Sequence, residues 1–263
     1  MHFILRFHHL DDLWAGRDLI IKLAWSDFKL RYKNSVLGFF WSLLEPLLML
    51  LVLYIVFSNL MRVQVEYYQL FLLLGIIMWN FLDRGTSMST QGIVGKPSLV
   101  QKVYFPRDIL IISTCLTALM MTLLELVVFV AFMVIFRITP SISILYFPLI
   151  FSLHFLIILG LSLGLSALNV YFRDVQFIWR LVLQVGFFAT PVIYPISIFP
   201  IDLQGLVMLN PVARVLTMLR NCTLYQISPT TGEMAYLTLS AIVVLLLGYF
   251  IFERLEPKFA EAI

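Results

Sequence analysis

The residues best placed to do chemistry are the few ionisable side chains that interrupt long apolar stretches. Glu45 precedes Pro46 inside an apolar run between about positions 36 and 60. A carboxylate within such a run is costly in lipid, and a proline there removes a helical hydrogen bond. The pair therefore predicts a hinge or a polar contact on a transport path, although a carboxylate paired with a neighbouring helix is an equally good interpretation. Glu125 and His154 lie in later apolar runs and are a candidate pair between two helices.

Other chemistries are poorly supported. In the segment that contains Gly95 and Lys96, the first glycine of a phosphate loop would fall at position 90, which is Thr, and Pro97 replaces the magnesium-binding Ser or Thr. The chain is therefore not expected to bind ATP itself. No metal site is predicted, because the histidines do not combine with cysteines or carboxylates at the spacing of a known metal motif, and no spacing indicates a catalytic residue. The absence of a basic run or zinc-finger pattern argues against nucleic acid.

The composition is that of a protein dissolved in lipid. Hydrophobic residues make up 61% of the 263 residues and charged residues only 13%, whereas soluble domains are about 25% charged. The apolar runs predict an all-α membrane protein, in which an N-terminal segment (1–35) precedes a transmembrane domain (36–263). Six transmembrane helices are expected, at about 37–60, 67–88, 109–136, 142–171, 176–194 and 235–252.

The distribution of positive charge orients these helices. If the N-terminus is cytoplasmic, most of the 18 Lys and Arg residues fall on the cytoplasmic side, as the positive-inside rule requires. Six crossings then return the C-terminus to the cytoplasm. Only four cations are left outside: Arg62, Arg137, Arg214 and Arg220.

Two segments outside the crossings have helical periodicity. Between positions 11 and 33, the apolar residues follow one helical face, which predicts a helix lying in the headgroup plane or one packed on protein. That face consists of Leu13, Ile20, Leu23, Ala24 and Phe28. In the outer loop (about 195–232), apolar spacing predicts two short helices that meet at Asn210-Pro211 and dip back toward the membrane. Gly160 and Gly164 form a small-residue face that favours close helix packing.

Several segments in order then resemble one family, the membrane subunit of ABC type-2 exporters that move polysaccharides, including O-antigen and teichoic-acid exporters. The matching pieces are LRYKNSVLGFFWSLLEPLL at 30–48, LVQKVYFPRDIL at 99–110, LNVYFRDV at 168–175, TPVIYP at 190–195 and LNP at 209–211.

The resemblance implies a half-transporter that is not catalytic alone. It would pair with a second copy of itself and with two ATP-binding subunits, which hold the ATP and magnesium. It would reside in the inner (plasma) membrane of a prokaryote and pass a lipid-linked polysaccharide through an aromatic-lined channel.

The resemblance also implies roles for particular residues. A cytoplasmic coupling helix would dock on the ATPase through Lys96, Lys102, Tyr104, Phe105, Pro106 and Arg107. The channel aromatics would come from Phe39, Phe40, Trp41, Tyr54, Phe57, Phe187, Phe188 and Tyr194. The N-terminal helix would form a headgroup gate with Trp25, Lys29, Arg31 and Lys33. The hinge would be Glu45 and Pro46, and the outer-loop helices would form an external gate.

Three other functions are compatible with the same helices. One is an ABC exporter of small hydrophobic compounds. Another is an ion-coupled secondary transporter that uses Glu45 or Glu125 as its proton site, although no inverted repeat supports it. The third is a scaffold that transports nothing.

Overall fold

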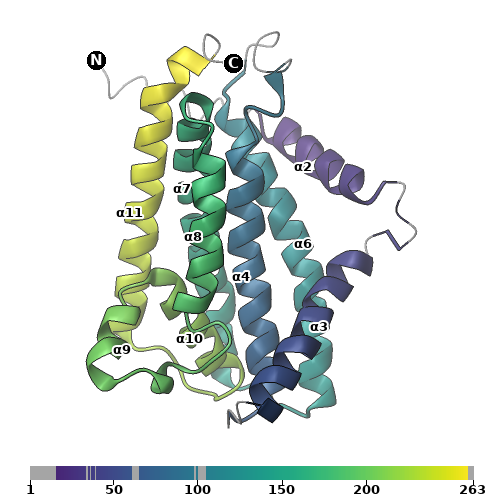
Figure 1. Cartoon of the computed structure of the whole chain (residues 1–263), viewed down its shortest axis with the longest axis vertical. Coiled ribbons are helices and arrows are strands. Elements are labelled where there is room, and N and C mark those ends of the chain that lie inside the picture. The colour runs from purple at the N-terminus through teal and green to yellow at the C-terminus, as the bar shows by residue number, and fades with distance from the viewer. Residues whose placement is uncertain are drawn as a thin grey trace.

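The chain folds into a bundle of helices in the computed structural model, which describes residues 16–33, 35, 37–38, 40–60, 65–97, 99 and 105–259 (Figure 1). No strand occurs among these residues. Four stretches are long and apolar enough to cross a membrane: Phe40–Ser58, Asp108–Ile135, Ile142–Tyr171 and Thr231–Lys258. The predicted all-α fold with membrane-spanning helices is confirmed at this level.

The helices of the bundle lie close to the predicted ranges. They are α3 (Phe40–Tyr54, continued by a π-helical segment Ile55–Leu60), α4 (Tyr68–Thr90), α6 (Asp108–Ile135), α7 (Phe147–Tyr171, preceded by a 3-10 turn Ile142–Tyr146), α8 (Val175–Ala189) and α11 (Thr231–Leu255, followed by a 3-10 turn Glu256–Lys258).

Two helix ends differ from the prediction for local reasons. The expected continuation of α8 to position 194 is wrong, because Thr190 is extended and precedes Pro191, which disfavours helical backbone before it. Helix α11 begins earlier than predicted, because Thr230 and Glu233 form a capping box at its N-terminus. Such a box satisfies two amide groups that a helix end otherwise leaves unpaired.

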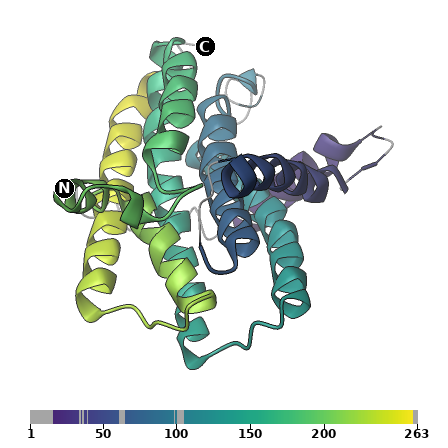
Figure 2. The same ribbon diagram turned by 60° about the horizontal axis from the view of Figure 1, so that its bottom comes forward.

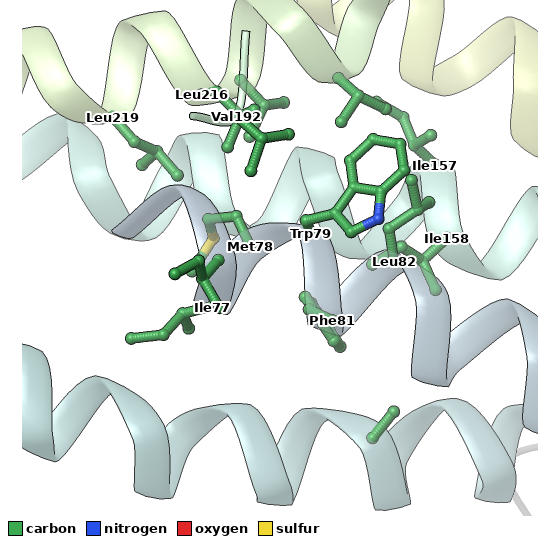
Figure 3. Close-up of a cluster of buried hydrophobic side chains, with 14 of the residues drawn as sticks. Ile77, Met78, Trp79, Phe81, Leu82, Ile157, Ile158, Val192, Leu216 and Leu219 are labelled. Carbon is green, nitrogen blue, oxygen red and sulfur yellow. The ribbon is translucent and has the colours of Figure 1, made fainter. Parts of the chain in front are cut away.

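Helix α4 lies in the middle of the bundle and contacts α3, α6, α7, α8 and α10. In the close-up of Figure 3, Trp79 and Phe81 point to opposite sides of α4, and both are buried. Their neighbours Ile77 and Met78 are fully buried as well. Most of α4 is covered by other helices, whereas the partly exposed Asn80, Asp83 and Ser87 recur every three or four positions and share one face of the helix.

Helices α7 and α11 pack with their backbones in contact at glycines. A Cβ atom on Gly160 would lie 2.6 Å from the Leu245 Cα and from the Val244 carbonyl oxygen. Gly164 faces Gly248, whose Cα would be 3.5 Å from an added Cβ. The predicted small-residue face on α7 is confirmed, and its partner is α11.

Connections and short helices gather at the two ends of the bundle. The N-terminal helix α2 (Arg17–Tyr32) and the end of α11 lie at the top of Figure 1, whereas α9 (Ile201–Val207) and α10 (Pro211–Thr223) lie at the bottom. The two outer-loop helices and the break at Asn210-Pro211 therefore occur as predicted. In Figure 2, α2 and α3 project from the side of the bundle that faces away from α11.

The apolar face predicted for the N-terminal helix packs on protein. Ala24 is fully buried, and its carbonyl oxygen accepts a hydrogen bond from Thr117 of α6 (3.1 Å). Ile20 on the same face is also buried. The large apolar side chains that remain exposed on α2 include Ile21 and Trp25, so these are the ones available to lipid.

Candidate functional site

A groove of about 620 Å³ lies between α3 and α4. It is lined by Trp41, Glu45, Leu48, Met49, Val52 and Asn80. The α3 residues recur every three or four positions, so they share one face of the helix. The volume is typical of sites that bind a small molecule or part of a larger one. Pro46, the other predicted hinge residue, is buried.

A smaller pocket of about 190 Å³ lies next to this groove, at the C-terminal end of α2. Both spaces share Trp41 and Glu45, and the smaller one is also lined by Arg31 and Tyr32. The predicted hinge carboxylate and a predicted gate cation therefore border the same small pocket.

The buried carboxylate of α6 is held by an arginine of α4. The Arg84 Nη2 atom lies 2.5 Å and 2.6 Å from the two carboxylate oxygens of Glu125, which is fully buried. The proposed pair of Glu125 with His154 is therefore wrong. His154 Nε2 instead lies 3.2 Å from the Met78 carbonyl oxygen, a contact between α7 and α4.

The predicted channel aromatics divide into two groups. Phe40 and Trp41 on α3 and Phe188 on α8 are 54%, 49% and 61% exposed, so these rings face the outside of the single chain. Such rings are available to lipid, to a second copy or to a substrate. Phe39 lies outside the described residues.

The other group packs inside the bundle. The rings of Tyr54 and Tyr68 are 6.2 Å apart, and Phe187 meets Trp79 edge-to-face at 5.9 Å. Phe57 packs against the core, and Tyr194 donates its hydroxyl proton to the Phe188 carbonyl oxygen. In the single chain, these four rings therefore help to hold the helices together.

The predicted gate residues lie in the C-terminal half of α2 and at its end. The Lys29 ammonium group lies 5.2 Å from the centre of the Trp25 ring, a distance at which cation and ring attract each other. The guanidinium of Arg31 contacts the Met88 sulfur at 3.6 Å, and Lys33 is exposed at the helix end. Lys29 and Lys33 also line a pocket of about 510 Å³ beside α2.

The first predicted coupling residue is tied to α2. The Lys96 ammonium nitrogen lies 2.6 Å from a carboxylate oxygen of Asp27, and both side chains are about three-quarters buried. This ion pair joins the segment after α4 to the N-terminal helix. Two predicted coupling residues lie outside the described part of the chain: Lys102 and Tyr104.

The last predicted coupling residue is tied to the C-terminal turn. The Arg107 amide donates to the Glu256 carboxylate (3.2 Å), and its guanidinium donates to the Glu256 carbonyl oxygen (3.1 Å). Phe105 and Pro106 beside it are half-buried. The predicted coupling segment therefore contacts α2 through Lys96 and the turn after α11 through Arg107.

A buried arginine on α10 is a feature that the sequence analysis missed. Arg220 is 3% exposed and donates four hydrogen bonds of 2.6–3.2 Å, to the carbonyl oxygens of Phe71, Pro191 and Val192. Burial lowers the pKa of its guanidinium to about 9, so the group stays charged at neutral pH. Gly75 leaves room for it, since a Cβ there would collide with the guanidinium. Helical spacing could have indicated its burial, because position 220 lies one turn after the apolar Leu216 on the same helix.

The described residues contain no group of three or more His, Cys, Asp or Glu side chains that could hold a metal ion. Both cysteines, Cys115 and Cys222, are free and buried.

Comparison with known proteins identifies the family. Residues 18–224 match the ABC-2 type transporter family. The chain belongs to the ABC-2 type transporters. It is similar to the O-antigen export system permease protein RfbA of Myxococcus xanthus, with 30% identity over 96% of this chain and 98% of the relative. A permease of the same name from Klebsiella pneumoniae is 29% identical over 93% of this chain and 94% of the relative.

A third relative of this ABC-2 type transporter is the polysialic acid transport protein KpsM of Escherichia coli. It is 24% identical over 88% of this chain and 90% of the relative. All three similarities extend over nearly the whole length of both proteins.

Proposed function

We propose that the chain is the permease subunit of an ATP-driven exporter that moves a lipid-linked polysaccharide from the cytoplasmic side across the inner membrane. The observation that carries this proposal is the near-full-length similarity to relatives named for O-antigen export and polysialic acid transport. The groove along α3 supports it, because it follows an apolar helix and shares Trp41 and Glu45 with a second pocket at the end of α2.

In this proposal, six helices cross the membrane. To the four apolar spans are added α8, which is apolar but short, and α4, which the other helices surround. The N- and C-termini are cytoplasmic, because this orientation places most Lys and Arg residues inside. Both α2 and the end of α11 lie at the top of Figure 1, which then corresponds to the cytoplasmic side.

The working transporter in this proposal is a homodimer with two ATPase subunits in the plasma membrane of a prokaryote. ATP and magnesium bind to those subunits. Residues 96–107 form the coupling segment. The contacts of Lys96 with Asp27 and of Arg107 with Glu256 support this role, because movement of the segment would displace both α2 and the end of α11.

The gates follow from the same arrangement. Trp25, Lys29, Arg31 and Lys33 form a headgroup gate at the cytoplasmic surface, where the cationic Arg31 and Lys33 attract the pyrophosphate of a lipid carrier. Helices α9 and α10 form the external gate, and Arg220 fixes α10 to α4 and to the loop after α8.

A deletion strain tests the proposal. Cells that lack the chain should lose surface glycan and accumulate it on its lipid carrier inside, and the reintroduced chain should restore export. The tagged chain should also copurify with an ABC ATPase at a one-to-one ratio. Normal surface glycan in the deletion strain would refute polysaccharide export, and purification without any ATPase in several mild detergents would instead favour an ion-coupled carrier.

A further inference from the structure

Two polar side chains in the α3–α4 groove have no protein partner within the described residues. The Glu45 carboxylate is exposed and takes part in none of the ion pairs or hydrogen bonds found there. The side-chain amide of Asn80 likewise makes no hydrogen bond to a described residue. The hydrogen bond from Arg84 Nε (3.2 Å) goes to the backbone carbonyl oxygen of Asn80. Each therefore needs a partner from outside the single chain.

The depth of the groove makes lipid tails a poor partner. Its α3 wall extends from Trp41 to Val52, which is about 16 Å along a helix that rises 1.5 Å per residue. This stretch lies within a candidate membrane span. Hydrocarbon offers no hydrogen bonds, so an unpartnered carboxylate or amide facing it costs several kcal/mol, of the order of 2–7. The occupant must therefore bring donors and acceptors to this depth.

The remaining wall indicates what kind of occupant fits. Trp41 is half-exposed and presents an aromatic ring beside the aliphatic side chains of Leu48, Met49 and Val52. A pyranose ring has apolar C–H faces that stack on such surfaces, and hydroxyl groups around its rim. A carboxylate accepts hydrogen bonds from hydroxyls, and an amide both accepts and donates them. Sugar units satisfy both halves of this lining at once, whereas a small hydrophobic compound satisfies only the apolar half.

The adjoining pocket carries a third polar group without a partner. The hydroxyl of Tyr32 is buried and makes no hydrogen bond to any described residue. It borders the same small pocket as Arg31 and Glu45. Polar side chains thus line both neighbouring pockets, the one at the end of α2 and the groove along α3.

We propose that Glu45 and Asn80 form a sugar-contact site on the path of the glycan, with Trp41 as its stacking surface. This inference rests on the proposed export function and identifies where the sugar units touch this chain. Hydroxyl groups exchange between the two side chains as the polymer advances, while the apolar wall permits sliding.

Photo-crosslinking in cells that contain the whole transporter tests this site. The photoreactive amino acid p-benzoylphenylalanine is placed at Met49, which lines the groove, or at Leu51, which is exposed on the same helix but does not line it. Adducts are probed by periodate oxidation and hydrazide labelling, which detects sugar of any identity. The label on intact cells reports export in the same cultures.

We expect the Met49 adduct to carry sugar and the Leu51 adduct to carry little. Glu45→Ala and Asn80→Leu, each combined with the Met49 probe, should lower the yield of sugar adduct about tenfold. Export with a Met49 adduct that contains only lipid, or only a second copy of this chain, would overturn the sugar-contact site and leave the export function intact. Absence of chain-dependent export would instead refute the function on which the site depends.

Discussion

The contact between α7 and α11 gives a sharp prediction for Gly160→Ala. The added methyl carbon would lie 2.6 Å from the Leu245 Cα and from the Val244 carbonyl oxygen. Carbon atoms in ordinary contact are about 3.5–4.0 Å apart, so the two backbones must separate by roughly 1 Å. A gap of that size forfeits up to about half of the dispersion energy of the neighbouring contacts.

The expected cost of this separation is about 2 kcal/mol, the midpoint for overpacking a well-packed interior. For a chain of this size, each kcal/mol lowers the Tm by about 2–4 °C. We therefore expect the Gly160→Ala variant to melt about 4–8 °C below the parent protein. The assay is fluorescence-detected gel filtration of the full-length chain after heating in detergent.

Two alanine variants serve as matched controls. At Gly164 the nearest atom to an added Cβ is the Gly248 Cα at 3.5 Å, an ordinary contact, and at Gly232 nothing lies within 4 Å. Both variants should melt within about 1–2 °C of the parent. If Gly160→Ala melts together with Gly232→Ala, the close approach of α7 and α11 does not exist in the protein.

Three further predictions concern polar contacts. Glu125→Ala leaves Arg84 buried without its counter-ion, so we expect the free energy of unfolding to fall by about 3–5 kcal/mol. The double variant Arg84→Met with Glu125→Leu should recover most of the Tm, and a double variant as unstable as Glu125→Ala would contradict the pairing. Asp27→Lys and Lys96→Asp should each lower glycan export up to about fivefold, because each breaks a partly exposed ion pair. The variant that carries both substitutions should restore export, and no recovery would show that the pair does not position α2. Arg220→Leu removes the arginine that donates to three backbone carbonyls, so little folded chain should survive detergent extraction. The yield of folded Arg220→Lys should lie between those of Arg220→Leu and the parent protein, and a parental yield of Arg220→Leu would refute the anchoring role.

The positions of the helices could be predicted because each one is encoded locally. An apolar run between about 36 and 60 needs only its own backbone hydrogen bonds to become a helix in lipid. The short outer helices and their break at Asn210-Pro211 were also local signals, and so was the glycine face of α7. The end of α8 was missed because apolarity continues past Ala189, whereas Thr190-Pro191 stops the helix.

The polar contacts between helices could not be predicted, because they depend on which helices become neighbours. The sequence analysis offered His154 as the partner of Glu125, whereas the packing of α4 against α6 selects Arg84. The same reason applies to Arg220, whose three carbonyl partners come from α4 and from the loop after α8. The apolar face of α2 was predicted correctly, but this face packs against α6 and does not face the lipid headgroups.

The buried pair between α4 and α6 has a consequence for how the chain enters the membrane during synthesis. Helix α4 emerges from the ribosome with Asp83 and Arg84 in its second half, and each such charge costs about 2.5–3.5 kcal/mol near the centre of an isolated inserted helix. Glu125, which relieves the cost of Arg84, follows 41 residues later. In the proposed six-helix arrangement, α4 is therefore most stable in the bilayer when it enters together with α6 as a hairpin, and the insertion machinery would have to retain it until α6 has been made.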